Sequence, residues 1–361
     1  MPTSPVLVFT TSEGHKSIGE SVVHFLQQND IASELVFIEE PGLKYYKLIY
    51  QYSPSSFRYF YKFSHTFLAN FFLKRVLLSE HEESVKKILD VKKAHLIIST
   101  SLGFTPAIAK YKQTHPEIHF INILPNPRTF FKQDIADQAN VQCVFDQQTV
   151  QDIKSIKETN VITTGWFVRP QFEGKYDKTQ VRKSLGLKDN LLTILCVSGS
   201  EGTKDILDTA LSLKDFANVQ IIVACGNNKT LLKQLKTLSD TTSKNITALP
   251  FTNQLHRYMQ AADLVVGKAG PNMVFEAIAT NTPFFATTHI GGLEDGNIQI
   301  IQEYDIGFVE EDKKRAIHVL QTLLASPDRI EQKRKNVEKL ASYLQKEKHN
   351  LIKYIHENVP V

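Results

Sequence analysis

The sequence has 361 residues, of which 42% are hydrophobic, so it is long enough for two domains with complete cores and is neither disordered nor a fibrous repeat. Its formal net charge of +4 suits a membrane surface, nucleic acid or neither. No apolar run approaches the roughly 18 residues that span a bilayer, and residues 1–5 carry no basic region before an apolar stretch. We therefore expect neither a secreted nor a transmembrane chain.

Short apolar runs alternate with amphipathic segments from end to end, which is typical of parallel α/β construction. The first half contains six candidate strands, at 6–10, 35–38, 95–99, 119–124, 141–145 and 161–163. After a polar stretch at 173–183, the second half contains six more, at 192–197, 220–224, 246–250, 264–266, 283–286 and 306–309. Charged amphipathic helices follow at 328–357. This pattern predicts two similar halves with a cleft between them.

The cysteines indicate the cellular compartment. Cys143, Cys196 and Cys225 are odd in number, far apart and placed in apolar runs, so we expect buried, reduced thiols. The sequence therefore predicts a cytosolic protein.

The first candidate strand ends in a loop that carries Gly14 and His15, and an apolar helical face follows it. The dipole of that helix disfavours an imidazolium at its start, so His15 is expected to stay neutral near pH 7 and to accept a proton. A general base needs this property. A loop-capping role for His15 is the alternative.

The segment 44–72 has 12 aromatic residues in 29 positions, and no acidic residue occurs between Glu40 and Glu80. Six cations lie in the same region: Lys44, Lys47, Arg58, Lys62, Lys74 and Arg75. An aromatic, basic, partly helical surface binds anionic bilayers, and each cation near the surface contributes about 1 kcal/mol. Core-packing helices with a solvated basic face are the alternative. Single-stranded nucleic acid also binds such surfaces, but no recognisable RNA or DNA module surrounds the segment.

The segment 267–297, GKAGPNMVFEAIATNTPFFATTHIGGLEDGN, is the most informative part of the chain. A buried strand turns at Lys268, Gly270 and Pro271 into a helix whose first position suits proline, and helix-start NH groups favour an anion. Glu276 lies just over one turn into that helix, near enough to its start to bind ligand hydroxyls. The loop at 291–297 presents further carboxylates and an amide at the carboxyl end of the sheet. The pattern indicates a nucleotide-sugar site, with an ordinary strand-turn-helix unit as the alternative.

These residues also resemble a family. The pair of motifs is similar to the donor-nucleotide signature of GT-B glycosyltransferases, most closely the monogalactosyldiacylglycerol synthase and processive diacylglycerol glucosyltransferase family, in which K-[AP]-G-[PG]-x-x-x-x-E-A precedes P-G-Q-E-x-G-N. Residues 164–172 resemble its T-G-x-P-V-R-P-x-F hinge, 198–202 its G-G-G-E-G loop and 249–253 its nucleobase loop. A mere turn at 198–202 and a core position for Phe251 are the alternatives.

The resemblance implies two Rossmann-like domains whose parallel sheets face each other across a cleft, with a C-terminal helix that crosses back. The expected divisions are an N-terminal acceptor and membrane-facing domain at 1–165, a linker at 166–183, a UDP-sugar-binding domain at 184–327 and the returning helix at 328–361. The implied catalytic base is His15. The implied donor-binding residues are Gly14, Gly199, Ser200, Gly202, Phe251, Lys268, Gly270, Pro271, Glu276, Gly292, Glu294, Asp295 and Asn297. Membrane or acceptor contacts are expected at Lys44, Tyr45, Tyr46, Arg58, Tyr59, Phe60 and Lys62.

The chain departs from the family at several landmarks. Leu293 replaces the usual Gln of the second motif, the loop before His15 has fewer glycines, and 99–103 lacks the usual H-P. Pro125 and Asn126 stand where a T-D pair is usual, so a carboxylate is missing there. These departures leave the sugar and the acceptor open.

The sequence thus predicts an inverting transferase that moves a hexosyl unit from a UDP-sugar to a membrane lipid hydroxyl, with diacylglycerol favoured. Lacking a D-x-D motif or a Cys/His cluster, it is expected to need no metal or other cofactor. Its expected partners are the donor, the lipid and an anionic membrane at the cytoplasmic face, without nucleic acid. An N-acetylglucosaminyltransferase acting on a polyprenyl diphosphate and a noncatalytic, membrane-associated nucleotide-sugar-binding relative are the alternatives.

Overall fold

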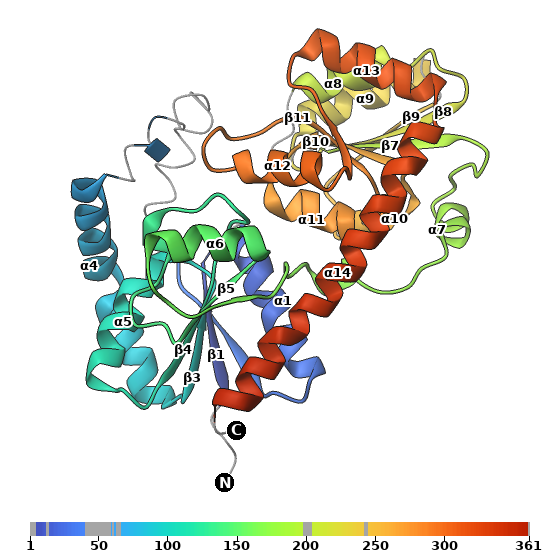
Figure 1. The fold of residues 1–361 in the computed structure, drawn as a ribbon. Helices are drawn as coiled ribbons and strands as arrows, with labels where there is room; N and C mark the ends of the chain where they lie inside the picture. Colours follow the sequence, from blue (N-terminus) through green and yellow to red (C-terminus); the bar gives the residue numbers. More distant parts are fainter. Residues whose placement is uncertain are drawn as a thin grey trace. The chain divides into compact units, whose positions relative to one another are not determined.

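The computed structural model describes residues 5–11, 14–39, 59, 61–62, 66–197, 204–241 and 245–359. Within these ranges the chain forms two compact units, each built on a six-stranded parallel sheet (Figure 1). The first unit contains residues 1–170, 290–296 and 343–361, and the second contains 171–289 and 297–342. The functional roles assigned to the two halves stay predictions.

The first sheet has the strand order β2-β1-β3-β4-β5-β6, and all its neighbours are parallel. Its strands are β1 (Val6–Thr10), β2 (Ser33–Phe37), β3 (Leu96–Ser99), β4 (His119–Ile123), β5 (Val141–Val144) and β6 (Val161–Thr163). Its helices are α1 (Gly14–Gln28), α4 (Phe67–Lys92), α5 (Thr105–Thr114) and α6 (Gln147–Ile156), with short 3-10 turns η2 (Leu102–Phe104) and η3 (Lys132–Asp134). In Figure 1, α1 lies on one side of this sheet and α4 and α5 lie on the other.

Alternation along the central strands explains this layering. Leu7 and Phe9 of β1 are fully buried in a cluster with Leu89 of α4 and Ile108 of α5. Because successive side chains of a strand point to opposite faces, Val8 faces the side of α1, and it too is fully buried. Strands that are buried on both faces read as continuous apolar runs, and this is why the sequence predicted them.

The second sheet has the order β12-β11-β10-β7-β8-β9, again all parallel. Its strands are β7 (Leu192–Val197), β8 (Val219–Ala224), β9 (Ile246–Leu249), β10 (Leu264–Lys268), β11 (Phe284–Thr288) and β12 (Gly307–Val309). Its helices are α7 (Lys178–Ser184), α8 (Lys204–Ser212), α9 (Lys229–Thr241), α10 (Leu255–Ala261), α11 (Pro271–Ala279), α12 (Asp295–Glu303) and α13 (Lys313–Ala325), with η4 (Pro170–Phe172) before them. Side chains of α8, α9 and α13 share one core with β7, β8 and β10.

All twelve predicted strands are present in the described ranges, with ends that shift by one or two residues. β10 and β11 end two residues later than predicted, at Lys268 and Thr288. They extend because Ala269 NH still donates to the Thr288 carbonyl oxygen at 2.9 Å, beyond the apolar part of each strand. The predicted C-terminal helix is α14 (Asp328–Asn358), which contributes to both units, through Ser342 to the second and from Tyr343 to the first.

The three cysteines are free and buried, as predicted. Burial raises the pKa of the Cys196 thiol to about 12 and that of the Cys225 thiol to about 11. These thiols therefore stay protonated near neutral pH and act as small apolar core groups.

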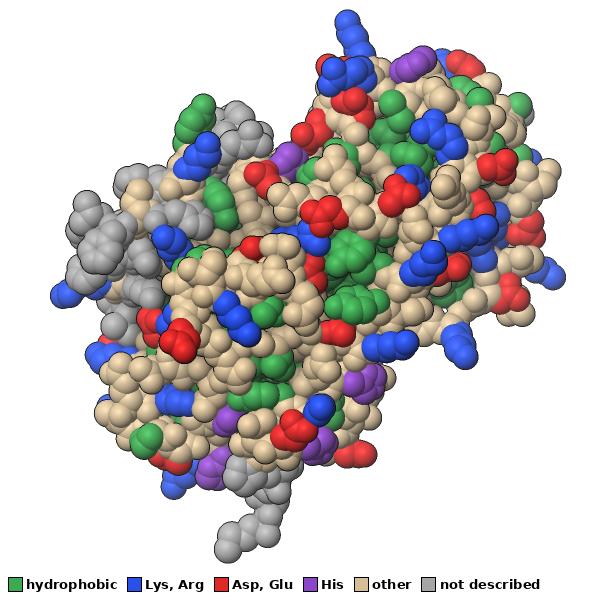
Figure 2. Space-filling model, viewed as in Figure 1, with side chains coloured by type: hydrophobic (Ala, Val, Ile, Leu, Met, Phe, Trp, Pro, Cys, Tyr) green, Lys and Arg blue, Asp and Glu red, His purple; other side chains and the backbone are tan. Residues whose placement is uncertain are grey.

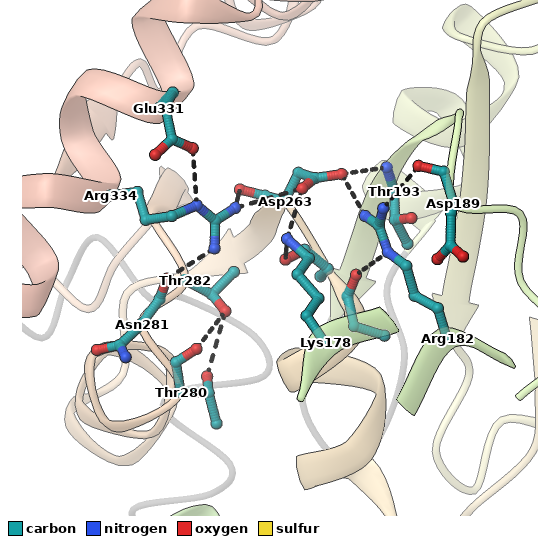
Figure 3. Close-up of polar contacts among 12 residues, drawn as sticks. Lys178, Arg182, Asp189, Thr193, Asp263, Thr280, Asn281, Thr282, Glu331 and Arg334 are labelled. Carbon is teal, nitrogen blue, oxygen red and sulfur yellow. Dashed lines mark hydrogen bonds and ion pairs between the residues drawn. The ribbon is translucent and has the colours of Figure 1, made fainter. Parts of the chain in front are cut away.

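A partly buried ion cluster joins α7 and α14 to the amino end of the second sheet (Figure 3). The Asp263 carboxylate lies 2.6 Å from Lys178 Nζ, 2.6 Å from an Arg182 terminal nitrogen and 3.3 Å from one of Arg334. It also accepts the Thr193 backbone NH at 2.7 Å. Lys178 and Arg182 come from α7 and Arg334 from α14, so one carboxylate ties two helices to the strands β7 and β10.

The pKa of Asp263 lies below its usual range. Burial alone would raise this pKa, but the Lys178 ammonium, the Thr193 NH and the Arg182 guanidinium favour the ionised carboxylate and outweigh burial. A carboxyl group with a depressed folded pKa stabilises the fold above its unfolded pKa of about 4, and this contribution disappears as the pH falls through the folded value.

We predict that Asp263→Asn destabilises the second unit by about 3 kcal/mol or more at neutral pH, since three cations would then face a neutral amide. Urea denaturation, with hydrogen exchange of β7 and β10 as the local probe, measures this loss. The matched control is Asp208→Asn, which breaks the surface pair with Lys313 in the same unit and should change stability by no more than about 1 kcal/mol. Equal losses in the two variants would contradict the assignment.

Candidate functional site

The first sheet has its topological switch point between β1 and β3. The chain runs from β1 outward to β2 and then returns to place β3 on the other side of β1. In open parallel sheets, ligands bind outside the carboxyl ends of the strands at such a point. His15 follows β1 and Thr100 follows β3, so the two residues meet at this position.

The His15 ring is oriented by the strand that follows the switch point. Its Nδ1 lies 3.0 Å from the Thr100 carbonyl oxygen. A carbonyl oxygen can only accept, so Nδ1 carries the proton and the neutral ring keeps the lone pair on Nε2. The Thr10 hydroxyl donates to the His15 carbonyl oxygen at 2.8 Å, and the Thr100 hydroxyl lies 3.1 Å from the Thr10 hydroxyl. Backbone and ring of His15 are both fixed.

Burial lowers the pKa of His15 below its usual 6.5, although the hydrogen bond to the Thr100 carbonyl oxygen works in the opposite direction. The sequence predicted a neutral histidine on account of the α1 dipole. The direction of the pKa shift agrees with this prediction, but its main cause is burial of the ring at the strand ends. His15 is therefore a neutral proton acceptor near pH 7.

Nitrogen-15 NMR of the histidine rings checks this geometry. We expect His15 at pH 7 to be the tautomer with protonated Nδ1 and bare Nε2, and to titrate below pH 6.5. A ring protonated at Nε2 would contradict the Thr100 contact, and a ring that titrates above pH 7 would contradict the lowering of its pKa by burial.

The second sheet has its switch point between β7 and β10, because the chain runs from β7 outward through β8 and β9 and then returns to the other side of β7. Two loops leave the sheet there. The loop after β7 contains Gly199, Ser200 and Gly202, which lie outside the described residues, so their predicted role in holding the diphosphate stays a prediction. The loop after β10 is the Lys268 to Pro271 turn.

That turn has the backbone form needed to begin a helix at the sheet edge. Gly267 pairs with Val197, and a side-chain carbon at Gly267 would overlap the Val197 carbonyl oxygen, so only glycine fits. Gly270 is the N-cap of α11 with extended angles (φ −72°, ψ 148°), it forms no side-chain cap hydrogen bond, and Pro271 is the first helical residue. The first turn of α11 thus presents backbone NH groups and a positive dipole end at the switch point.

Glu276 and Asn297 pack around this helix start. Glu276 is 2% exposed on α11. Asn297 is equally buried, and its Nδ2 donates to the Ala269 carbonyl oxygen at 2.8 Å. The Asn297 amide therefore supports the turn before Gly270, while its predicted contact with a sugar hydroxyl stays a prediction. Lys268 is half-buried at the end of β10.

The acidic loop, residues 290–296, packs with the first unit and is closed by its own carboxylates. Glu294 accepts the Ile290 NH at 2.6 Å, and the Glu294 NH donates back to the Ile290 carbonyl oxygen at 2.8 Å. Asp295 accepts the Gly292 NH at 2.8 Å, and Gly292 has φ +90°. One oxygen of each carboxylate thus holds a turn of the loop.

Phe251 follows β9 and is 62% exposed, so the alternative that it is a core residue is wrong. An exposed aromatic ring can stack on a base, and the contact of Phe251 with a nucleobase stays a prediction.

The predicted membrane surface is only partly described. Tyr59 is 76% exposed and Lys62 is exposed. Lys44, Tyr45, Tyr46, Arg58 and Phe60 lie outside the described residues. On the face shown in Figure 2, cationic and anionic side chains are interspersed over the described surface. Membrane contact stays a prediction.

Sequence reasoning missed three residues that shape the site. Thr100 orients His15, and its position at the end of the strand beside β1 was a usable signal. Thr129 and Tyr61 contact the acidic loop, but nothing in the sequence relates positions so far apart from that loop.

In the described ranges, the structure shows neither a membrane-spanning helix nor a metal-binding cluster. Among the described residues, no helix is both long and apolar enough to cross a bilayer. The same residues contain no group of three or more His, Cys, Asp or Glu side chains that could hold a metal ion. Metal independence stays a prediction.

Known structures share this fold. MurG of Acinetobacter baumannii matches with a TM-score of 0.61 and 16% identity, covering 96% of this chain and all of that one. The UDP-GlcNAc 2-epimerase of Neisseria meningitidis, solved with UDP-GlcNAc, matches with a TM-score of 0.65 and 13% identity. This match covers 98% of this chain and 100% of that one. At these identities the likeness shows the fold alone. The protein has the GT-B fold of two Rossmann-like units.

Sequence relatives indicate the class of glycosyltransferase to which the chain is similar. Residues 193–353 match the glycosyltransferase family 28 C-terminal domain. The processive diacylglycerol beta-glucosyltransferase of Bacillus pumilus is 27% identical over 183 residues, which are 50% of this chain and 48% of that protein. Monogalactosyldiacylglycerol synthase 2 of Arabidopsis thaliana is 26% identical over 247 residues, 65% and 52% of the two chains. The match spans about half the length of these relatives.

These matches support the resemblance that the motifs predicted, to the glycosyltransferase family of monogalactosyldiacylglycerol synthases and processive diacylglycerol glucosyltransferases.

Proposed function

We propose that the protein is an inverting glycosyltransferase that moves a hexosyl unit from a UDP-sugar to the hydroxyl of a membrane lipid, with diacylglycerol as the favoured acceptor. One observation carries this proposal: a neutral, oriented histidine lies at the switch point of one sheet, and a capped helix start with a buried glutamate lies at that of the other. The names of the sequence relatives support a lipid acceptor.

In the proposed reaction, Nε2 of His15 takes the proton of the acceptor hydroxyl. The acceptor oxygen then attacks the anomeric carbon from the face opposite UDP. The bond from that carbon to the diphosphate oxygen breaks, and UDP leaves with the bonding electrons. Attack from the opposite face inverts the anomeric configuration, and the two substrates must be held in line for it.

On the donor side, the first-turn NH groups of α11 face the diphosphate and Glu276 binds the ribose hydroxyls. Phe251 stacks on the uracil, while Glu294, Asp295 and Asn297 address the sugar. Negative charge that develops on the leaving diphosphate is stabilised by the helix start, assisted by Lys268. No metal is needed for this step.

On the acceptor side, we place the protein on the cytoplasmic face of a membrane, where the aromatic basic segment 44–72 contacts anionic lipid. Lys62 and Tyr59 are described members of that segment, and both are exposed. This placement brings the lipid hydroxyl to the unit that carries His15.

The class of reaction is tested by incubating the protein with diacylglycerol-containing liposomes and a panel of radiolabelled UDP-sugars. We expect label in the extracted lipid. Transfer of N-acetylglucosamine to a polyprenyl diphosphate acceptor alone would favour the peptidoglycan-type alternative. Nucleotide binding without transfer to any lipid would favour a noncatalytic relative.

His15→Ala should lower kcat by roughly 10²- to 10⁴-fold, the usual worth of a general base, while the Kd for UDP stays unchanged. Because the neutral ring is the active form and its pKa lies below 6.5, kcat/KM of the wild type should be level through neutral pH and fall about tenfold per pH unit below that pKa. His15→Ala should lose this acidic limb. An unchanged kcat in His15→Ala would show that His15 has no catalytic role.

Phe251→Ala should weaken UDP binding by roughly 5- to 150-fold, because base stacking is worth about 1–3 kcal/mol. Phe251→Tyr keeps the ring and serves as the control. Titration calorimetry with UDP measures both, and an Ala variant that binds UDP as the wild type does would remove Phe251 from the base site.

A further inference from the structure

The acidic loop and the helix that follows it are capped by a distant side chain. Gly296 lies in the first turn of α12, and its NH donates to the Thr129 hydroxyl oxygen at 2.5 Å. First-turn NH groups of a helix have no partner within the helix and need an external acceptor. Thr129 supplies one from 167 residues away in the chain. The acidic loop therefore ends at a backbone NH group that Thr129 caps.

Two glycines of the acidic loop lie so close to neighbouring residues that a side chain would not fit there. At Gly296, a side-chain carbon would lie 2.7 Å from the Pro127 carbonyl oxygen and would overlap the Thr129 hydroxyl. At Gly292, it would lie 2.9 Å from Tyr61 Cβ, and the φ of +90° already excludes most other residues. Both ends of the acidic loop thus fit against the first unit.

The surface that receives the loop is itself rigid. Arg128, between Pro127 and Thr129, has φ +53° and forms a buried ion pair with Asp146, with 2.9 Å and 2.8 Å from its Nε and a terminal nitrogen to one carboxylate oxygen. The other oxygen of Asp146 accepts the Thr149 NH at 3.0 Å and so caps α6. This ion pair holds the Thr129 hydroxyl in a fixed place.

Tyr61 is anchored to the same segment. Its hydroxyl donates to the Phe130 carbonyl oxygen at 3.0 Å, and its ring lies 5.2 Å from the ring of Phe131. Burial, with the nearby charges of Asp134 and Asp295, raises the pKa of Tyr61 to about 12, so the hydroxyl stays a donor at any ordinary pH. Tyr61 belongs to the aromatic basic segment 44–72, which we assign to the acceptor side.

We propose that Thr129 and Tyr61 are positioning residues for the acidic loop, and that these two side chains therefore help to set recognition of the donor sugar. The inference rests on the proposed function in assigning the sugar to this loop. Its structural part, the capping of α12 by Thr129, stands independently. Neither residue touches the reacting atoms; both act through Glu294 and Asp295.

The pair Thr129→Val and Thr129→Ser isolates the cap. Valine keeps the shape and removes the acceptor, whereas serine keeps the acceptor. We expect Thr129→Val to speed hydrogen exchange of the Gly296 amide by roughly 2- to 12-fold, the worth of one hydrogen bond, and to raise the Kd for UDP-glucose or UDP-galactose by a similar factor. The Kd for UDP alone should stay within about twofold of the wild-type value. Thr129→Ser should restore both quantities.

Tyr61→Phe and Tyr61→Ala test the second contact in the same way. The Phe variant keeps the packing on Gly292 and should discriminate UDP-hexose from UDP nearly as the wild type does, whereas the Ala variant should lose part of that discrimination. Equal weakening of UDP and UDP-hexose in Thr129→Val, or unchanged exchange at Gly296, would overturn the inference. A wild-type protein that binds neither ligand would sink the proposed function instead, and the exchange comparison would still decide the cap.

Discussion

Both sheets are wholly parallel and both reverse their strand order once, and the placement of every candidate residue depends on this constraint. Parallel strands bring all their carboxyl ends to one edge, so loops far apart in sequence gather there. The reversal lies between β1 and β3 in one sheet and between β7 and β10 in the other. His15 and Thr100 meet at the first, and the helix start at Gly270 and Pro271 lies at the second.

The sequence predicted the strands because strands buried on both faces leave continuous apolar runs, and it predicted the α11 start because glycine and proline mark helix beginnings. It also predicted that His15 is neutral, though from the helix dipole and not from burial, which is the larger cause. The dipole of α1 was visible in the pattern, while the burial that dominates the pKa depends on how β1 and β3 pair, and local sequence does not encode that pairing.

For the same reason, the sequence could not predict contacts between side chains that are far apart in the chain. The Thr129 cap of α12 and the Asp263 cluster each depend on side chains that only the tertiary fold brings together. The second motif shows the consequence most clearly. Its acidic residues were predicted as ligands, and the structure shows that Glu294 and Asp295 close the loop by accepting hydrogen bonds from its own backbone.

The central claim is that a UDP-sugar binds at the switch point of the second sheet. A crystal structure of the protein with UDP tests it most directly. The account predicts diphosphate oxygens within about 3 Å of the first-turn NH groups of α11 and a ribose hydroxyl on the Glu276 carboxylate. UDP bound with its ribose away from Glu276, or with its phosphates away from α11, would contradict the account.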